Sequence, residues 1–158
     1  MKNSTIWSGF VRRVFAAGAG LGLVGCSAGA VDVVDLATLE RPSSPNTYLV
    51  CPADRTTAEV DREPPVHALS ADELERVWLD ALAGEPRLER RIAEAAARRY
   101  VFVQRTPVFR FPDVIQLEIL EAPPDGSTIC LYSRSLYGYS DLGANRARVE
   151  DWLARISP

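Results

Sequence analysis

The sequence predicts an α+β domain in which helices pack on one face of a small antiparallel sheet, giving two layers. Three observations support this prediction. A capped amphipathic helix begins after Ser70, apolar runs typical of strands lie between residues 100 and 133, and a second amphipathic helix ends the chain. Because no repeat, heptad or low-complexity block divides this part of the chain, we expect a single domain over residues 35–158.

The first 25 residues are typical of a secretory signal peptide. Lys2, Arg12 and Arg13 are positive, and residues 14–24 are all apolar or small. This run is shorter than the roughly 20 residues that a helix needs to cross a bilayer. It ends at Leu23-Val24-Gly25-Cys26, which resembles the bacterial lipobox. We expect a lipid on Cys26 and a short spacer over residues 26–34; the alternative is an ordinary signal peptide ending near a cysteine.

Charge and the residue after Cys26 bear on location and partners. Ser27 stands where an aspartate would resemble an inner-membrane retention signal, which favours the outer membrane, facing the periplasm, over the inner membrane. The net charge is −3, and loss of Lys2, Arg12 and Arg13 changes it to −6, that is, −3 minus 3. We expect no nucleic-acid partner, because binding phosphates requires clustered positive charge.

Two helices are predicted between residues 70 and 99. Ser70 and Glu73 match the capping box, in which each side chain bonds the other residue's backbone amide. Gly84 suits the end of this helix, and Pro86 suits the first turn of the next. The expected inward faces are Leu74, Val77, Trp78 and Ala81 in the first helix, and Leu88, Ile92 and Ala95 or Ala96 in the second.

Strands are predicted at residues 100–104, 114–120 and 128–133, where β-branched and aromatic residues dominate. Ile115, Leu117 and Ile119 should face inward, and Gln116 and Glu118 outward. Residues 123–126 supply turn chemistry that would pair the last two strands. Residues 47–51 are an ordered segment on the core, and residues 31–39 fit either a strand or a helical turn.

Two cysteines remain in the domain, Cys51 and Cys130. A disulfide between them would close a long loop and contribute ~3–4 kcal/mol in the chain-entropy account. Two buried free thiols are the alternative, since cysteine is a common core residue.

Residues 132–148 collect most of the unusual polar chemistry. Asp141 is a candidate N-cap for the terminal helix, whose apolar face would contain Leu142, Val149, Trp152, Leu153 and Ile156. At 100° per residue, Asn145 lies about 40° from Val149 and therefore faces the core. In the preceding strand, Ser133 and Ser135 share one face and Arg134 points to the other.

Three motifs stand out together: Pro45-Asn46; Phe111-Pro112-Asp113; and Ser133-Arg134-Ser135 followed by Gly138, Asp141, Gly143, Asn145 and Arg148. With them, the chain from about residue 35 to residue 156 resembles the domain-of-unknown-function family DUF1499. Many members of that family carry an arginine where Leu136 stands, so a contact made by that arginine is not expected here. The resemblance implies one domain and no assigned activity.

The polar cluster allows three interpretations. In a structural one, Asp141 and Asn145 attach the loop to the helix. In a binding one, Arg134, Arg146 and Arg148 converge on an acidic small ligand or envelope protein, since arginine suits carboxylate and phosphate. A stacking or saccharide-facing role for Tyr132, Tyr137 and Tyr139 stays open as a further alternative.

An enzyme is the less favoured interpretation. The sole histidine, His67, lies in a proline-bounded segment, and no serine sits in a Gly-x-Ser-x-Gly elbow. A hydrolase acting on an envelope component would have to use the Asp113, Ser133 and Asp141 region. The sequence names no catalytic residue, and we expect no metal or cofactor. We predict a non-catalytic binding or interaction module.

Overall fold

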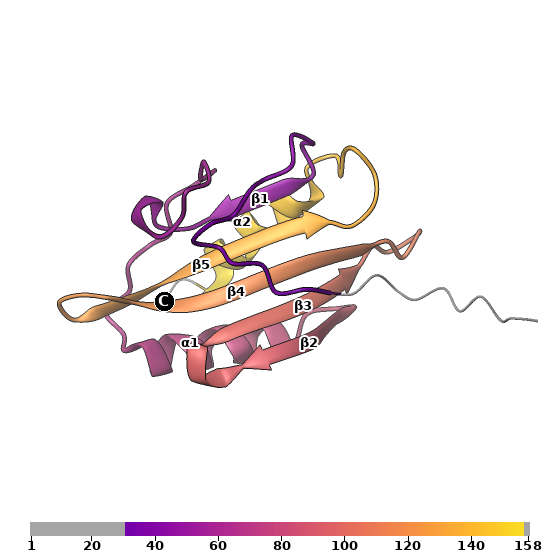
Figure 1. Ribbon diagram of the computed structural model, residues 1–158. Coiled ribbons are helices and arrows are strands. Elements are labelled where there is room, and N and C mark those ends of the chain that lie inside the picture. The colour runs from indigo at the N-terminus through magenta and orange to yellow at the C-terminus, as the bar shows by residue number, and fades with distance from the viewer. Residues whose placement is uncertain (1–30, 157–158) are drawn as a thin grey trace, which may run out of the picture. The chain divides into compact units, whose positions relative to one another are not determined.

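A five-stranded antiparallel sheet forms the centre of the fold, in the order β1-β5-β4-β3-β2 (Figure 1). The computed structural model describes residues 31–156, so the predicted signal peptide and Cys26 lie outside the described residues. The strands are β1 (Thr47–Val50), β2 (Leu88–Glu94), β3 (Arg99–Arg105), β4 (Pro112–Ala122) and β5 (Gly126–Ser135). The helices are α1 (Ala71–Ala83) and α2 (Ala144–Ile156), with single 3-10 turns η1 (Ala53–Arg55) and η2 (Ala95–Ala97).

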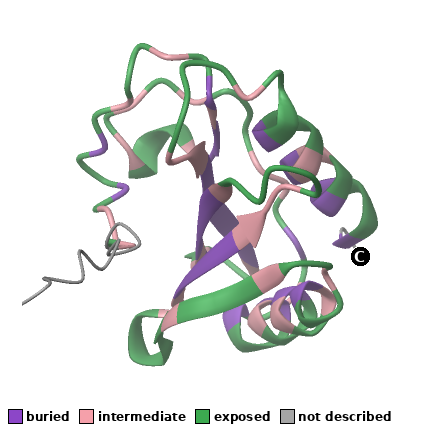
Figure 2. Cartoon of the chain, turned by 90° about the vertical axis from the view of Figure 1, so that its right-hand side faces the viewer, coloured by how far each residue is buried: buried purple, intermediate pink, exposed green. Residues whose placement is uncertain are grey.

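Both helices pack on the same face of the sheet, which confirms the predicted two-layer α+β architecture. Figure 2 shows them on one side of the strands, with the loops of the N-terminal part on the other. Trp78 of α1 and Trp152 of α2 are each 1% exposed and belong to one core cluster with Ile115 and Leu117 of β4. Between residues 31 and 156, no helix is long and apolar enough to span a bilayer.

The first helix begins as predicted. The Ser70 hydroxyl accepts a hydrogen bond from the Glu73 amide, and the Glu73 carboxylate accepts one from the Ser70 amide. Helix α1 buries Leu74, Trp78 and Leu82, whereas Val77, expected inside, is 36% exposed at the edge of the buried stripe.

The second predicted helix is wrong: residues 88–94 form β2 at an edge of the sheet. The register of β2 against β3 shifts between Arg90 and Ile92. Leu88 therefore stands opposite Gln104 and packs with the helix-side core, while Ile92 stands opposite Val101 on the other face. Leu88 and Ile92 are four positions apart, a spacing that is also typical of one face of a helix. In the strand, the bulge between them places the two side chains on opposite faces of the sheet.

The chain from residue 31 to residue 39 covers the sheet face that has no helices, and we call this segment the strap. It forms neither a strand nor a helix, the two alternatives that its sequence allowed. Val34 exchanges backbone hydrogen bonds with the Gln116 side chain, at 2.9 and 2.8 Å. Gln116 does point away from the helices, but the strap leaves it only 2% exposed. The packed chain therefore begins before the expected domain start at residue 35.

Under the strap, a disulfide joins Cys51 and Cys130, whose Cα atoms are 4.1 Å apart. Cys51 directly follows β1 and Cys130 lies in the neighbouring β5, so the bond links two adjacent strands. Both cysteines are buried beside Leu36, Leu49 and Tyr132. The disulfide alternative, rather than the free thiols, is the one that the structure contains.

Helix α2 buries Asn145, Val149, Trp152, Leu153 and Ile156, as its periodicity predicts. Leu142 was expected on the same face, but this prediction is wrong. It lies in the turn before the helix, has φ 55° and is 96% exposed.

Candidate functional site

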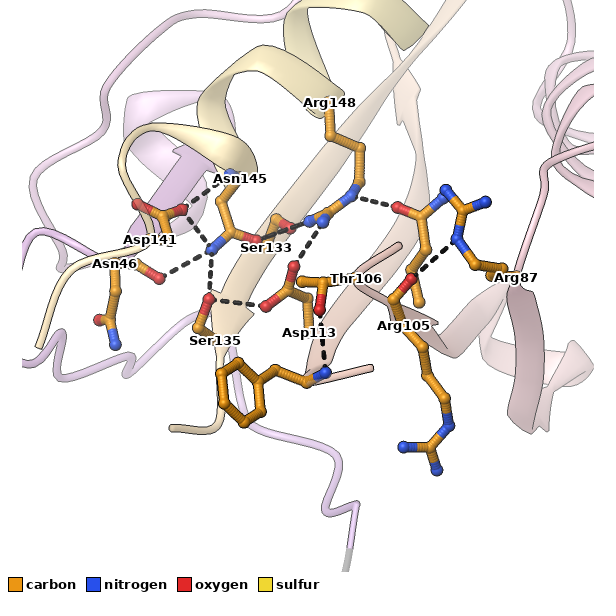
Figure 3. Close-up of polar contacts among 12 residues, drawn as sticks. Asn46, Arg87, Arg105, Thr106, Asp113, Ser133, Ser135, Asp141, Asn145 and Arg148 are labelled. Carbon is orange, nitrogen blue, oxygen red and sulfur yellow. Dashed lines mark hydrogen bonds and ion pairs between the residues drawn. The ribbon is translucent and has the colours of Figure 1, made fainter. Parts of the chain in front are cut away.

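A network of polar side chains fills the junction of β1, β3, β4, β5 and α2, at the end of the sheet where α2 begins (Figure 3). We call it the junction network. Its members are Asn46, Gln104, Asp113, Ser133, Ser135, Asp141, Asn145 and Arg148. Most were singled out from the sequence, and the fold brings them together because strand alternation points residues 113, 133 and 135 toward the helices.

Arg148 is the cation of the junction network. Its guanidinium forms an ion pair with Asp113, and the two side chains are 11% and 3% exposed. The same group donates to the Ser133 hydroxyl at 2.9 Å and to the Asn145 carbonyl oxygen at 2.7 Å, and its Nε donates to Gln104. The charge is therefore compensated and the donors are directed at four acceptor side chains.

Asn145 is the centre of the network and is fully buried. Its amide oxygen accepts from Ser133 at 2.6 Å, and its amide nitrogen lies 2.9 Å from the Asn46 carbonyl oxygen. The same nitrogen lies 3.1 Å from the Ser135 hydroxyl and 2.7 Å from an Asp141 oxygen. The expectation that Asn145 faces the core is confirmed, and its partners offset a desolvation cost of ~1–3 kcal/mol.

Asp141 holds the start of α2 from three residues upstream. Its carboxylate accepts hydrogen bonds from the Gly143 amide at 3.0 Å and the Asn145 amide at 2.7 Å, which satisfies donors that a helix start leaves open. Gly138 and Gly143 have φ of 87° and 81°, a region that side chains disfavour. The Gly138 carbonyl accepts from the Asn46 side chain at 2.8 Å, so the loop is tied to β1 as well.

The candidate catalytic residues of the junction network are engaged with protein partners. Ser133 is fully buried and its hydroxyl donates to Asn145, so no base is placed to take its proton. Asp113 is paired with Arg148 and also accepts from Ser135 at 2.6 Å. Within residues 31–156, the one buried side-chain polar atom that lacks a hydrogen-bond partner is Nε1 of Trp78, away from this network.

His67 belongs to another part of the fold. Its backbone forms two hydrogen bonds with Ser127 at the start of β5, at 2.8 and 3.0 Å. Burial lowers the pKa of its imidazole, so the neutral form is favoured. The sole histidine and the junction network are thus held at opposite ends of β5.

The three arginines of the predicted anion site do not converge. Arg148 is inside the junction network, and Arg146 lies over the Tyr48 ring, with its guanidinium carbon 5.9 Å from the ring centre. Arg134 lines a cavity on the strap side of the sheet, the opposite face from Ser133. The strand alternation expected for residues 133–135 is therefore present, but it separates the arginines.

The cavity beside Arg134 has a volume of about 230 Å³, and we call it the Arg134 cavity. Its lining combines polar and apolar groups: Val34, Leu39, Glu40, Pro42, Ser44, Asn46, Thr47, Tyr132, Arg134 and Ser135. Arg134 is half-buried, and no ion pair joins it to a carboxylate within the described part of the chain. Burial raises the pKa of the Tyr132 phenol, while Arg134 acts in the opposite direction.

Two network members were not identified from the sequence as site residues, Gln104 and the backbone of Asn46. Alternation along β3 could have found Gln104, because it shares the helix-side face with Phe102. Phe111 lies outside the network and is 52% exposed, and Pro112 contributes its carbonyl to the Leu136 amide at 3.2 Å.

Comparison with known proteins agrees with the resemblance noted from the motifs. The family described as "Protein of unknown function (DUF1499)" matches residues 38–156, which is more than half of the chain and contains the whole junction network. No curated protein and no solved structure matches the chain. The chain belongs to the DUF1499 family.

Proposed function

We propose that this protein is a non-catalytic binding module, anchored to the bacterial envelope by a lipid on Cys26 and facing the periplasm. The anchor is supported by the charged start of the chain, the short apolar run and the lipobox-like Leu23-Val24-Gly25-Cys26. Metabolic labelling with a fatty acid tests it. The wild-type chain should take up the label and Cys26→Ala should not; uptake by Cys26→Ala contradicts the anchor.

The hydrogen bonds and the ion pair within the junction network favour a binding role over a catalytic one. Asp113, Ser133 and Asp141 are the residues that an envelope hydrolase would have to use, and all three are engaged with protein partners. A nucleophile needs a nearby base and a space for the reacting carbonyl, and Ser133 has neither. The network is better suited to holding β4, β5 and α2 in one geometry.

The observation that carries the binding proposal is Arg134 in its cavity. A half-buried guanidinium without a carboxylate partner attracts an anion from solution, and its planar donors suit a carboxylate or phosphate. The hydroxyls of Ser44, Thr47 and Tyr132 line the same cavity and can accept or donate further hydrogen bonds. The ligand class is therefore a small acidic molecule, or an acidic side chain of an envelope protein.

Arg134→Gln tests this site, with acetate, succinate and inorganic phosphate as probes in thermal-shift and calorimetric titrations. Loss of a charge-assisted hydrogen bond of about 1.5–3 kcal/mol should weaken binding by roughly tenfold to 150-fold. Arg146→Gln is the matched control, because Arg146 is exposed on the helix side. Equal binding by wild type and Arg134→Gln, or loss of binding in Arg146→Gln alone, contradicts the assignment.

A further inference from the structure

Large apolar side chains are exposed at one end of the domain. Eight are exposed within residues 31–156, and six of them lie in two loops. The β3–β4 hairpin carries Val108, Phe109 and Phe111, and the loop between β5 and α2 carries Tyr137, Tyr139 and Leu142. We call these two loops, residues 106–111 and 136–143, the apolar tip. Exposed apolar groups gathered in this way mark contact surfaces.

The two loops of the apolar tip are neighbours. The Leu136 amide at the base of one loop donates to the Pro112 carbonyl at the base of the other, at 3.2 Å. In the hairpin, the Phe109 and Phe111 rings stack with centres 5.7 Å apart. Both loops leave the sheet at the same end, because β4 begins where β5 ends (Figure 1).

Leu142 combines an exposed apolar side chain with an unfavourable backbone conformation. It is 96% exposed and has φ 55°, a left-handed conformation that costs a leucine free energy. Its amide donates a hydrogen bond to the Ser140 hydroxyl at 3.2 Å, but its side chain has no such compensation and stays in solvent. Contact with an apolar phase outside the domain would remove the Leu142 side chain from water and offset this cost.

Positive charge accompanies the apolar tip. Arg105 and Arg110 belong to the hairpin and its strand, and Arg87 lies beside them, just before β2. Two of these side chains donate to carbonyl oxygens: Arg87 to the Arg105 carbonyl at 3.1 Å, and Arg105 to the Arg110 carbonyl at 3.3 Å. No ion pair joins any of the three to a carboxylate within the described residues.

Several acids lie toward the other end of the sheet, whereas Asp141, within the apolar tip, accepts hydrogen bonds from amides at the start of α2. Glu121 lies near the end of β4, Asp125 lies in the β4–β5 turn, and Asp72 lies in the first turn of α1. A chain with a net negative charge thus presents uncompensated arginines beside its most exposed apolar side chains. Apolar and aromatic groups beside arginines are the combination that the interface of an anionic bilayer favours.

The position of Val31 fixes which end of the domain lies near the proposed anchor. Val31 packs against the cluster of Val101, Val103 and Val114, together with Leu136 at the base of the tip. Five peptide steps separate Cys26 from Val31, and at about 3.6 Å each they span at most about 18 Å. The bilayer that holds a lipid on Cys26 therefore cannot be far from the apolar tip.

We propose that the apolar tip docks on the phospholipid bilayer, with Phe109, Tyr139 and Leu142 among the acyl chains and glycerol groups and the arginines on headgroup phosphates. The inference rests on the proposed anchor. A lipid anchor and a second, weaker contact together hold a protein firmly at a membrane surface. Docking at the tip would also orient the domain and leave the β4–β5 turn pointing into the periplasm.

Site-specific fluorescence tests the docking on the full lipidated chain, reconstituted into vesicles of phosphatidylethanolamine and phosphatidylglycerol. Phe109→Cys and Tyr139→Cys would each carry an environment-sensitive dye, and Asp125→Cys at the opposite end is the control. Each variant offers one reactive thiol, since Cys51 and Cys130 are bonded to each other and the lipid occupies Cys26. The dye at 109 and 139 should shift to the blue and be quenched by brominated acyl chains, and the dye at 125 should not.

Removal of two charges tests the headgroup contact. Arg105→Gln combined with Arg110→Gln should weaken the association of the tip with anionic vesicles by at least about tenfold, at about 1 kcal/mol per arginine. Vesicles without phosphatidylglycerol should show little difference between this double variant and the wild type. An equal response on both kinds of vesicle would overturn the role given to the arginines.

The proposal is overturned if the dyes at 109 and 139 remain as exposed to water as the dye at 125. It is also overturned if they respond to peptidoglycan fragments or an envelope protein but not to vesicles. Fatty-acid labelling reports the anchor independently. Should the wild-type chain take up no label, the dye at 109 on a Phe109→Cys chain that also carries Cys26→Ala, titrated with anionic vesicles, decides between a tip that still reaches the acyl chains and one that does not.

Discussion

Arg148 and Asp113 show how single residues of the family motifs are used in this fold. They lie 35 positions apart, one on α2 and one on β4, and their ion pair is almost entirely shielded from water. A buried pair contributes little net stability compared with apolar residues of similar shape, but breaking it leaves an uncompensated charge. The pair and its hydrogen bonds therefore act mainly to select one docking position for α2.

Arg148→Met should destabilise the domain by about 3–5 kcal/mol, because the Asp113 carboxylate would stay buried without its cation. Equilibrium denaturation in urea measures this loss. Arg146→Met is the matched control, because Arg146 lies two residues away on the same helix and is exposed. It should cost less than about 1 kcal/mol.

The double variant Asp113→Leu with Arg148→Met completes the test. It removes both charges and should recover part of the loss that Arg148→Met causes. If Arg148→Met costs no more than Arg146→Met, the junction network does not position α2.

At the scale of elements, the edges and the uncovered face of the sheet are each protected differently. Edge strand β2 carries Glu89, Arg90 and Arg91 and is irregular, both of which oppose pairing with another chain. At the opposite edge, β1 is only four residues long and is followed at once by the disulfide. The strap covers the face between them, so a sheet with helices on one side has a core on both.

Cys51→Ala combined with Cys130→Ala should destabilise the domain by about 2–5 kcal/mol, since the bond closes a segment with a sequence separation of 79 residues. Thermal unfolding of this variant measures the effect, with the oxidised wild type as reference. Reduced wild type should unfold at nearly the same temperature as the variant. A variant as stable as the oxidised protein would show that β1 is held by the strap and its hydrogen bonds alone.

At the scale of the whole molecule, one apolar cluster joins both helices to the sheet. Trp78, Trp152 and the helix-side core residues of β1, β3, β4 and β5 belong to it, so neither helix has a separate core. The two smaller clusters lie on the strap side. A layer that shares its whole buried face with the next layer should not unfold by itself.

The domain should therefore unfold in one cooperative transition. Tryptophan fluorescence reports the helix–sheet core through Trp78 and Trp152, and far-ultraviolet circular dichroism reports the secondary structure. The two signals should give the same midpoint in urea for the chain without its first 25 residues. A fluorescence change that precedes loss of circular dichroism would show that the helix layer separates first.

The sequence alone could predict the parts of this fold that depend on neighbouring residues. The capping box at Ser70, the alternation of β4 and the inward position of Asn145 are all visible in short windows. The edge strand β2 could not be recognised, because its bulge interrupts the alternation of a strand and its apolar residues Leu88 and Ile92 are spaced as on a helix. The side-chain pairs are harder still: Gln116 meets Val34 from 82 positions away, and nothing local indicates this partner.

The same limit applied to the candidate site. Alternation correctly placed Arg134 on the opposite face from Ser133, but it could not show that Arg148 forms an ion pair with Asp113. Only the assembled fold distinguishes an arginine that holds the structure from one that lines a cavity.

The strap has a mechanical consequence under the proposed lipid anchor on Cys26, which would tether the chain near its N-terminus. Tension on Val31 would reach the sheet through its contacts with Val101, Val103 and Val114. It would then pass through the hydrogen bonds of Val34 with Gln116 on the central strand β4, before it reached the short edge strand β1. The two hydrogen bonds between these residues are loaded together, and the segment between Val34 and β1 is shielded from the pull while they hold. The attachment point thus distributes force into the best-supported strand of the domain and spares its weakest edge.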